Sequence, residues 1–466
     1  MLLERGPRGE TGPVLGDGTP VADLIDFENY EVSMRVLNDP EIHRLELKYL
    51  FGRTWNLLGH ESEIPEPSDY VMRYIGEDPV IVTRDREGEI HVLLNVCAHR
   101  GMMICRSEGG KGTQFRCPYH GWTFSNTGKF LGAPIAAQQM HGSIRSKDQL
   151  GLVKARVDTF LGMIFATWDP EAPSLGDFLG DIKWYLKLMF GRTEDGIEVL
   201  GPPQRFMIKA NWKCAGEQHA GDGYHNLTLH QSLQELNAMS GSEESPVAMA
   251  GLNISANGHG LRCIDTREPF INALKGQGID HDMPPLEKLK LSPPPGMTPD
   301  QVPALTTRFN ADELRVLADF APQVGGLFPN VGTFAVPFPM PDGMSALLSL
   351  HTFIPRGPEH FEFFNWFLVE KSAPPEMRRR MSRTSNLSFG ISGFVESDDA
   401  DTWPQMTQAA GGYLGSQQKL RYQALLGERK PDDWPGGGHV YDGFGKDDNQ
   451  WNWWLRYADF MTGRPW

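Results

Sequence analysis

The chain of 466 residues has few cysteines, fewer basic than acidic residues, and no long hydrophobic run. Its five cysteines are too few and too unevenly placed for a disulfide framework, which favours a reducing compartment. No stretch approaches the ~20 apolar residues of a membrane-spanning helix, and the first residues hold no hydrophobic segment of signal-peptide length. We therefore expect a cytoplasmic protein without a membrane partner.

The balance of charge and hydrophobic residues limits the remaining classes. Lys and Arg number 44 against 59 Asp and Glu, a net charge of −15, which disfavours nucleic acid as a partner. Hydrophobic residues make up 40% of the chain and Trp occurs 12 times, which supplies a packed core and argues against a largely disordered protein. The length exceeds what one core usually organises, so we expect two domains of unequal size.

The order of strand and helix patterns divides the chain into three parts. Residues 1–52 predict an arm followed by an amphipathic helix over 39–51, which packs on the larger domain. Short β-branched and aromatic runs predict an all-β domain over 53–172. Residues 173–466 mix both patterns, including a predicted helix over 411–426, and indicate a larger α+β domain.

The most specific motif pairs a cysteine with a histidine in two loops of the predicted all-β domain. These pairs are Cys97 with His99 and Cys117 with His120, and a glycine directly follows the second pair and lies two residues after the first. A [2Fe-2S] cluster held by two thiolates on one iron and two neutral imidazoles on the other needs this set of ligands. A structural zinc site is the alternative, although zinc motifs usually space the first pair by two to four residues.

These loops resemble the Rieske iron-sulfur proteins, and the resemblance implies Cys97, His99, Cys117 and His120 as cluster ligands. High-potential members of that group carry an additional disulfide, and the corresponding positions here are Met102 and Tyr119. The resemblance is therefore to the lower-potential centres of oxygenases and their ferredoxins.

A second concentration of histidines and acidic residues lies in the segment 211–230. Two histidines and one carboxylate on one face of an iron form a facial triad that leaves positions open for O2 and substrate. The candidate histidines are His225 and His230, and the carboxylate is expected from the segment 394–399, which contains Glu396, Asp398 and Asp399. Residues five apart on an ideal helix are rotated by about 140°, so the two histidines converge only where the helix is irregular.

Together the two motifs resemble the large (alpha) subunits of Rieske non-haem iron aromatic-ring-hydroxylating dioxygenases of the naphthalene, biphenyl and polycyclic-aromatic type. The resemblance implies a small all-β Rieske domain and a larger α+β catalytic domain, with a helix-grip-like antiparallel sheet. It implies one [2Fe-2S] Rieske cluster and one mononuclear Fe(II) per subunit, the latter held by His225, His230 and Asp399. Asp222 matches the carboxylate that links the cluster histidine of a neighbouring subunit, here His120, to an iron-binding histidine. A helix N-terminal cap is the alternative role for Asp222.

The resemblance also implies a set of substrate-binding residues. It places around the substrate cavity Gln218, His219, Asn226, Phe389 and Val395. Small apolar lining is implied at Pro322 and Val324, which predicts room for two or three fused rings. Aromatic hydrocarbons and aromatic carboxylates both remain open as substrates.

The implied activity is that of a terminal oxygenase, which adds O2 to an aromatic ring and gives a cis-dihydrodiol. Electrons from NADH arrive through a separate reductase and ferredoxin, since the chain has no G-x-G-x-x-G dinucleotide fingerprint after a strand. The expected assembly is an alpha trimer, completed by small beta subunits to an α3β3 hexamer. The alternatives are a Rieske monooxygenase or demethylase, and an electron-transfer protein without catalytic iron.

Overall fold

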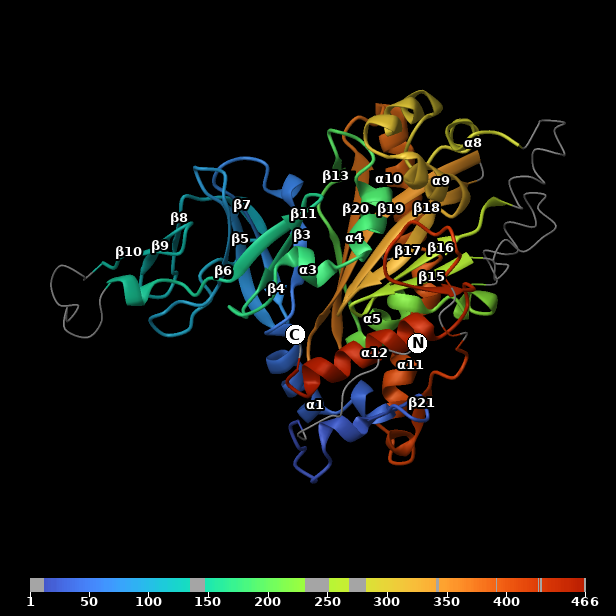
Figure 1. Ribbon diagram of the computed structural model, residues 1–466. Coiled ribbons are helices and arrows are strands. Elements are labelled where there is room, and N and C mark those ends of the chain that lie inside the picture. The colour runs from blue at the N-terminus through green and yellow to red at the C-terminus, as the bar shows by residue number, and fades with distance from the viewer. Residues whose placement is uncertain are drawn as a thin grey trace. The chain divides into compact units, whose positions relative to one another are not determined.

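The computed structural model describes residues 12–134, 147–230, 251–267, 282–340, 343–390, 392–425, 427 and 430–464 (Figure 1). The chain forms two compact units. The smaller unit is Phe51–Leu175, and the larger unit combines Met1–Leu50 with Gly176–Trp466. None of the helices among the described residues is long and apolar enough to cross a membrane.

The smaller unit is built from short antiparallel strands. These form three sheets with the orders β6-β5-β4-β7, β10-β9-β8 and β11-β12-β3. The strands are β3 (Asn56–His60), β4 (Asp69–Ile75), β5 (Asp78–Arg84), β6 (Ile90–Leu94), β7 (Gly109–Lys111), β8 (Gln114–Arg116), β9 (Thr123–Ser125), β10 (Phe130–Gly132), β11 (Arg156–Phe160) and β12 (Met163–Thr167). One of its hydrophobic clusters includes Cys97, Cys117 and Trp122, so both predicted cysteine ligands lie at the edge of a packed core.

The larger unit is built on one antiparallel sheet. Among the described residues its strands follow the order β13-β20-β19-β18-β17-β16-β15-β22, and β14 also pairs with β20. The strands are β13 (Ile197–Val199), β14 (Gln204–Ile208), β15 (Gly251–Ala256), β16 (His259–Ile264), β17 (Pro322–Leu327), β18 (Val331–Met340), β19 (Gly343–Pro355), β20 (Phe361–Glu370) and β22 (His439–Asp442). This architecture confirms the predicted fold class, an all-β unit plus a larger α+β unit with an antiparallel sheet.

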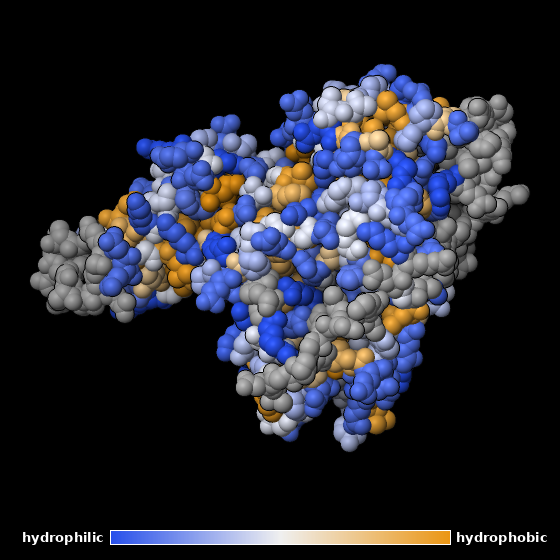
Figure 2. Space-filling view, viewed as in Figure 1, coloured by the Kyte–Doolittle hydropathy of each residue, from blue (hydrophilic) through white to orange (hydrophobic). Residues whose placement is uncertain are grey.

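Helices cover the sheet of the larger unit. They are α1 (Pro40–Glu46), α3 (Leu175–Leu179), α4 (Ile182–Phe190), α5 (Trp212–Gly221), α8 (Pro285–Leu291), α9 (Ala311–Asp319), α10 (Pro375–Phe389), α11 (Glu396–Ala410) and α12 (Asp448–Met461). Figure 1 shows α12 running beside α5, and the two helices are in contact. On the face of the larger unit visible in Figure 2, hydrophilic residues separate small hydrophobic patches, as expected when most apolar side chains lie inside.

Two glycines let α5 lie directly on one face of the sheet. A Cβ at Gly326 would stand 2.6 Å from the main chain of Ala220, and one at Gly332 would stand 2.5 Å from the ring of His219. Both distances are shorter than any real contact, so only glycine allows this approach. α4 covers the opposite face, where Leu188 and Ala335 line a common cavity.

A buried ionic cluster attaches the N-terminal helix to α5 and α12. Glu46 accepts hydrogen bonds from Lys213 Nζ (2.5 Å), Trp212 Nε1 (3.0 Å) and the Tyr457 hydroxyl (2.6 Å). Glu46 and Lys213 are both fully buried. Removing one partner of such a pair leaves an uncompensated buried charge, which typically costs about 3–5 kcal/mol. The cluster therefore fixes the position of α5, which leads into the segment that carries His225 and His230.

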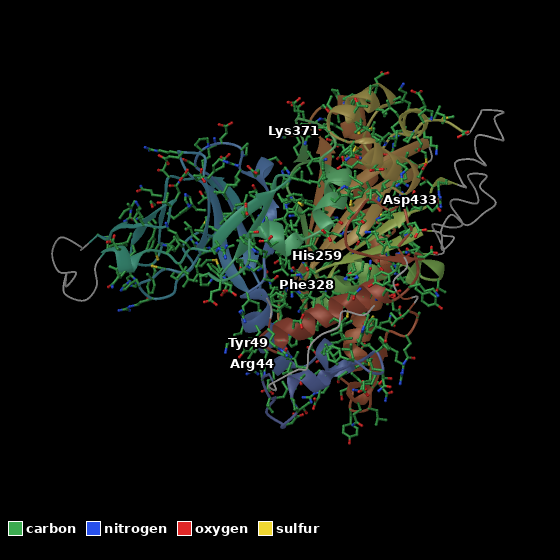
Figure 3. All side chains as sticks on the ribbon, in the orientation of Figure 1. Arg44, Tyr49, His259, Phe328, Lys371 and Asp433 are labelled. Carbon is green, nitrogen blue, oxygen red and sulfur yellow. The ribbon has the colours of Figure 1, made fainter. Side chains whose placement is uncertain are left out.

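A neutral histidine joins the ends of β16 and β17 to α3. His259 and Phe328 lie close together (Figure 3), and the Phe328 main-chain N–H donates to His259 Nδ1 (2.9 Å). Burial lowers the pKa of His259 to about 4, so the ring stays neutral at physiological pH. Since Nδ1 accepts, Nε2 carries the proton and donates to the carbonyl of Phe178 (2.9 Å).

The predicted helix over 411–426 is wrong. The segment contains a short 3-10 turn, Gly415–Gln417, and the strand β21 (Lys419–Arg421), which pairs with β2 (Glu31–Ser33). Three glycines at 411, 412 and 415 weaken helix propensity here, and pairing with a strand nearly 400 residues earlier decides the conformation. The helix over 39–51 does form, as α1 followed by a π-helical turn over Leu47–Phe51.

Candidate metal centres

The two cysteine-histidine loops of the smaller unit have the same backbone construction. In the first loop the N–H of Cys97 donates to Met102 and the N–H of Gly101 donates back to Cys97 (both 2.9 Å). In the second, the N–H of Cys117 donates to Trp122 (2.7 Å) and the N–H of Gly121 donates back to Cys117 (3.0 Å). Both glycines have positive φ, 74° and 72°, which a residue with a Cβ adopts only with strain.

These loops bring the four predicted cluster ligands together. The rings of His99 and His120 lie 4.6 Å apart between centroids, and His99 stacks on Trp122 at 4.8 Å. Both thiols are buried and free of disulfides. Burial, reinforced by a hydrogen bond with the Cys117 thiol, raises the pKa of the Cys97 thiol. Two buried thiols without disulfides and two neighbouring imidazoles, carried by the same pair of loops, supply the two ligands that each iron of a [2Fe-2S] cluster needs.

A second cluster of donor atoms lies beyond the C-terminal end of α5 in the larger unit. α5 ends at Gly221, and His225 lies in a 3-10 turn over His225–Leu227. The chain between His225 and His230 is therefore not α-helical, which lets the two imidazoles converge despite their five-residue spacing. Asp399 comes from the first turn of α11. One donor atom of each residue lies within 4.8 Å of the others.

The side chains of this cluster point at one another through defined atoms. His225 Nε2 lies 3.9 Å from Asp399 Oδ1, and His230 Nε2 lies 3.4 Å from Asp399 Oδ2. Two Nε2 atoms and a carboxylate converging on one point fit a divalent iron with open coordination positions. Asp399 also accepts a hydrogen bond from Gln218 Nε2 (2.7 Å). The side-chain oxygen of Gln218 in turn accepts one from Trp403 Nε1 (2.7 Å).

A second carboxylate lies beside each histidine. His225 Nδ1 lies 3.3 Å from Asp222 Oδ2, and His230 Nδ1 lies 3.2 Å from Asp398 Oδ2. Metal-binding histidines commonly donate their second ring N–H to such a carboxylate, which fixes the tautomer and the orientation of the ring. In both histidines Nε2 faces Asp399, and Nδ1 faces the second carboxylate.

Asp222 also caps the turn that carries His225. Its Oδ1 accepts the main-chain N–H groups of Tyr224 (2.8 Å) and His225 (3.1 Å). One oxygen of the carboxylate thus caps the turn after α5, and the other faces His225. Although burial opposes ionisation, hydrogen bonding and attraction by His225 lower the pKa of Asp222.

The predicted substrate-binding residues occupy different environments. Phe389 and Val395 belong to one hydrophobic cluster with Phe334, Phe338, Leu347 and Phe367, against which Val324 packs. Asn226 donates to the carbonyl of Gly223 (3.2 Å) inside the turn that carries His225. Pro322 instead lines a cavity on the α4 side of the sheet.

His219 is buried between aromatic rings of the sheet. Its centroid lies 5.5 Å from Phe334 and 4.7 Å from Phe353. Burial lowers the pKa of His219 to about 4, so the ring is neutral at physiological pH. Nδ1 donates to the carbonyl of Ala215 (2.8 Å), which leaves Nε2 as a hydrogen-bond acceptor.

Sequence reasoning missed the supporting residues around the donor cluster. Asp398 was considered only as a competitor of Asp399, yet it lies beside His230. Gln218, predicted to bind substrate, also donates to Asp399 and accepts from Trp403, and the sequence did not indicate these two contacts. The two consecutive aspartates in the segment Glu396–Asp399 could have indicated the role of Asp398. No sequence signal indicated the role of Trp403.

Glu217, on the buried side of α5, makes a pH-dependent contribution to stability. Burial, helped by repulsion from Asp222, raises the pKa of Glu217 from 4.5 to about 8. Between pH 4.5 and about 8 the folded protein retains a proton on Glu217 that the unfolded chain has released. Stability therefore falls as pH rises from about 5 to 8. Glu217→Gln should remove up to about 1.4 kcal/mol per pH unit of that fall, measured by urea unfolding at several pH values. Glu376→Gln, at an exposed site on α10, is the matched control; equal pH slopes for wild type and Glu217→Gln would contradict this assignment.

Comparison with known proteins decides the family. Residues 54–153 match the Rieske [2Fe-2S] domain, and residues 177–424 match the catalytic domain of the ring hydroxylating alpha subunit. The chain belongs to the alpha subunits of Rieske ring-hydroxylating dioxygenases. This family carries a Rieske cluster and a mononuclear iron, so the protein is an iron-dependent oxidoreductase that takes an aromatic substrate, O2 and electrons from partner proteins.

Individual relatives of this alpha subunit extend over nearly its whole length. It is 32% identical to biphenyl 2,3-dioxygenase subunit alpha of Rhodococcus jostii (strain RHA1), over 89% of this chain and 86% of the relative. It is 31% identical to the N,N-dimethyl phenylurea N-demethylase subunit alpha of Sphingobium sp. (strain YBL2), over 91% and 90% of the two chains. The crystal structure of naphthalene 1,2-dioxygenase from Rhodococcus sp. bound to indole matches with a TM-score of 0.81 and 36% identity, covering 93% of this chain and 94% of that one.

Proposed function

We propose that this alpha subunit converts an aromatic substrate and O2 into a cis-dihydrodiol. The observation that carries the proposal is the convergence of His225, His230 and Asp399, beside an apolar cluster that contains Phe389 and Val395. Iron bound by these three residues supplies the activation of O2. The apolar side chains bind a planar ring and keep water away from the reacting carbons.

The cluster and its electron path are assigned to residues of this chain as part of the same proposal. Cys97, His99, Cys117 and His120 hold the [2Fe-2S] cluster, which receives electrons from NADH through a reductase and a ferredoxin. Asp222 binds His225 through Oδ2 and is the carboxylate that meets His120 of a neighbouring copy. This path requires a head-to-tail alpha trimer, completed by beta subunits to α3β3.

The proposal also divides the chain into functional parts and locates the protein. Residues 1–52 form an arm and helix on the catalytic domain, 53–172 form the Rieske domain, and 173–466 form the catalytic domain. The assignment of residues up to Leu50 to the larger unit supports the first part. Five free cysteines and dependence on NADH support a cytoplasmic location.

The experiment uses chemically reduced holoenzyme and labelled O2, which bypasses the partner proteins. One- to three-ring aromatics and aromatic acids are added, and the products are identified by mass. A diol that contains two labelled oxygen atoms is the expected result. If products form but none of them is a diol, the proposal is contradicted.

A Rieske monooxygenase is the second candidate. The observation that favours it is the similarity to the N,N-dimethyl phenylurea N-demethylase subunit alpha, which is as close as several dioxygenase relatives. The same experiment separates the two candidates, because a phenol or a demethylated product contains at most one labelled oxygen.

A further inference from the structure

One row of side chains crosses the central sheet on the face that carries α5. Directly paired residues on antiparallel strands point to the same face. The strand pairs Asn253–Arg262, Arg262–Val324 and Val324–Phe334 therefore place four side chains in one row, from β15 to β18. The contact of Phe334 with His219 of α5 identifies the face. The row thus begins with two polar residues and ends in the apolar cluster that contains Phe389.

Arg262 is a buried cation beside the donor cluster. Its side chain is 3% exposed, and its guanidinium carbon lies 5.5 Å from the centre of the Phe444 ring. Nη1 donates to the main-chain carbonyl of Asp222, while Nε is buried and has no hydrogen-bond partner among the described residues. Burial lowers the pKa of Arg262 to about 10, which leaves the side chain charged at neutral pH.

Neither nearby carboxylate serves as a counter-ion for Arg262. Asp222 and Asp399 are close enough for their charges to affect the arginine, but neither forms an ion pair with it within the described parts of the chain. Asp222 is occupied by two main-chain N–H groups and His225, and Asp399 by Gln218 and the two histidines. A buried charge without a partner costs several kcal/mol, so this position is suited to an anion that enters from outside.

Asn253 supplies an independent observation at the same end of the row. It stands opposite Arg262 in the β15–β16 ladder and is completely buried. Neither its side-chain oxygen nor its side-chain nitrogen has a hydrogen-bond partner among the residues that the structure describes. An amide donor next to a guanidinium is a set of groups that binds the two oxygens of a carboxylate.

The opposite end of the row suits an aromatic ring. The Phe334 and Phe389 rings are 4.9 Å apart, and Val324 lies between Arg262 and Phe334 in the row. Arg262 and Phe334 are separated by two strand spacings, about 10 Å. An aromatic acid that lies along this row has its carboxylate at Arg262 and its ring against the phenylalanines.

We propose that the substrate of this oxygenase is an aromatic carboxylic acid, whose carboxylate is bound by Arg262 together with Asn253. The inference rests on the proposed function, because it names the substrate class of the same site. Arg262 is thereby a specificity-determining residue. An uncharged hydrocarbon leaves the guanidinium unpaired and is bound less tightly.

Binding is tested separately from turnover. Equilibrium dialysis of the holoenzyme with labelled benzoate, phthalate, 2-naphthoate and naphthalene gives the dissociation constant of each. At least one acid should bind more tightly than naphthalene to the wild-type protein. Arg262→Met should raise the dissociation constant of that acid at least tenfold, as expected for loss of a buried charge-assisted hydrogen bond. Arg262→Lys should restore part of the affinity. Arg267→Met, at an exposed arginine five residues away, is the matched control and should change nothing.

Turnover by the same variants gives the second measurement. The ratio of kcat/KM for the acid to kcat/KM for naphthalene should fall at least tenfold in Arg262→Met, mainly through KM for the acid, with unchanged iron content. Equal losses for the acid and naphthalene would show that Arg262 only balances the charge of Asp222, and would overturn the proposal. Tighter binding of naphthalene than of every acid by the wild type would also overturn it. In that case a labelled diol from naphthalene would leave the proposed function standing.

Discussion

Replacing His225 with alanine should lower the iron content from three atoms per chain to two and abolish product formation. Two irons belong to the Rieske cluster and one to the site formed by His225, His230 and Asp399. With only one histidine and one carboxylate left, the site loses a third of its protein ligands and with them its hold on the metal. The [2Fe-2S] cluster lies in the smaller unit, so its visible absorption should persist in the variant. Metal analysis and absorption spectra of the purified variant provide the measurement.

A matched substitution separates this effect from general damage. His360 lies in the turn between β19 and β20, so His360→Ala should retain three irons and wild-type turnover. His225→Ala protein that still contains three irons and forms product would refute the assignment of the mononuclear site.

The second prediction separates the roles of the two carboxylate oxygens of Asp222. Asp222→Asn keeps a side-chain oxygen that can accept the N–H groups of Tyr224 and His225, so the turn and both metals should be retained. The variant removes the negative charge that lies 3.3 Å from His225 Nδ1. Since this contact is proposed to lie on the electron path, multiple-turnover activity should fall by about 10- to 100-fold. Turnover with an electron donor, together with iron content, is the measurement.

The control for Asp222→Asn is a charge change elsewhere in the same unit. Asp401 is exposed on α11 and bonds only Gln405 of its own helix, so Asp401→Asn should leave turnover unchanged. Asp222→Asn protein with full iron and ordinary multiple-turnover activity would remove Asp222 from the electron path. Loss of iron would instead show that its role is to hold His225 in place.

The sequence was informative where short segments carry the chemistry. The two cysteine-histidine loops bring their ligands together locally, and short β-branched and aromatic runs indicated the strands of the smaller unit. It was less informative where distant segments meet. The spacing of His225 and His230 suggested a conflict with helix geometry, which the end of α5 at Gly221 resolves. No pattern indicated that β21 pairs with β2, and this pairing overrides the helical periodicity of 411–426.

The arrangement of polar residues inside the catalytic unit lay outside what one sequence reveals. Arg262 reads as an ordinary residue of an alternating strand, where it would normally face water. Its burial depends on the register of β15, β16 and β17 and on the position of Asp222 after α5. Gln218 likewise becomes a partner of Asp399 only when α11 packs beside α5. Such contacts between distant segments require the folded structure.

The contact of Glu46 with Lys213 and Tyr457 has a consequence for dividing this protein into fragments. Helix α1 precedes the Rieske unit in the chain but belongs to the catalytic unit, so the Rieske unit is an insertion between residues 50 and 176 of a discontinuous domain. A fragment that starts at residue 173 would bury the Lys213 ammonium group without its carboxylate. An isolated catalytic unit should therefore be obtained by replacing the insertion with a short linker, which keeps α1, rather than by removing the N-terminal part of the chain.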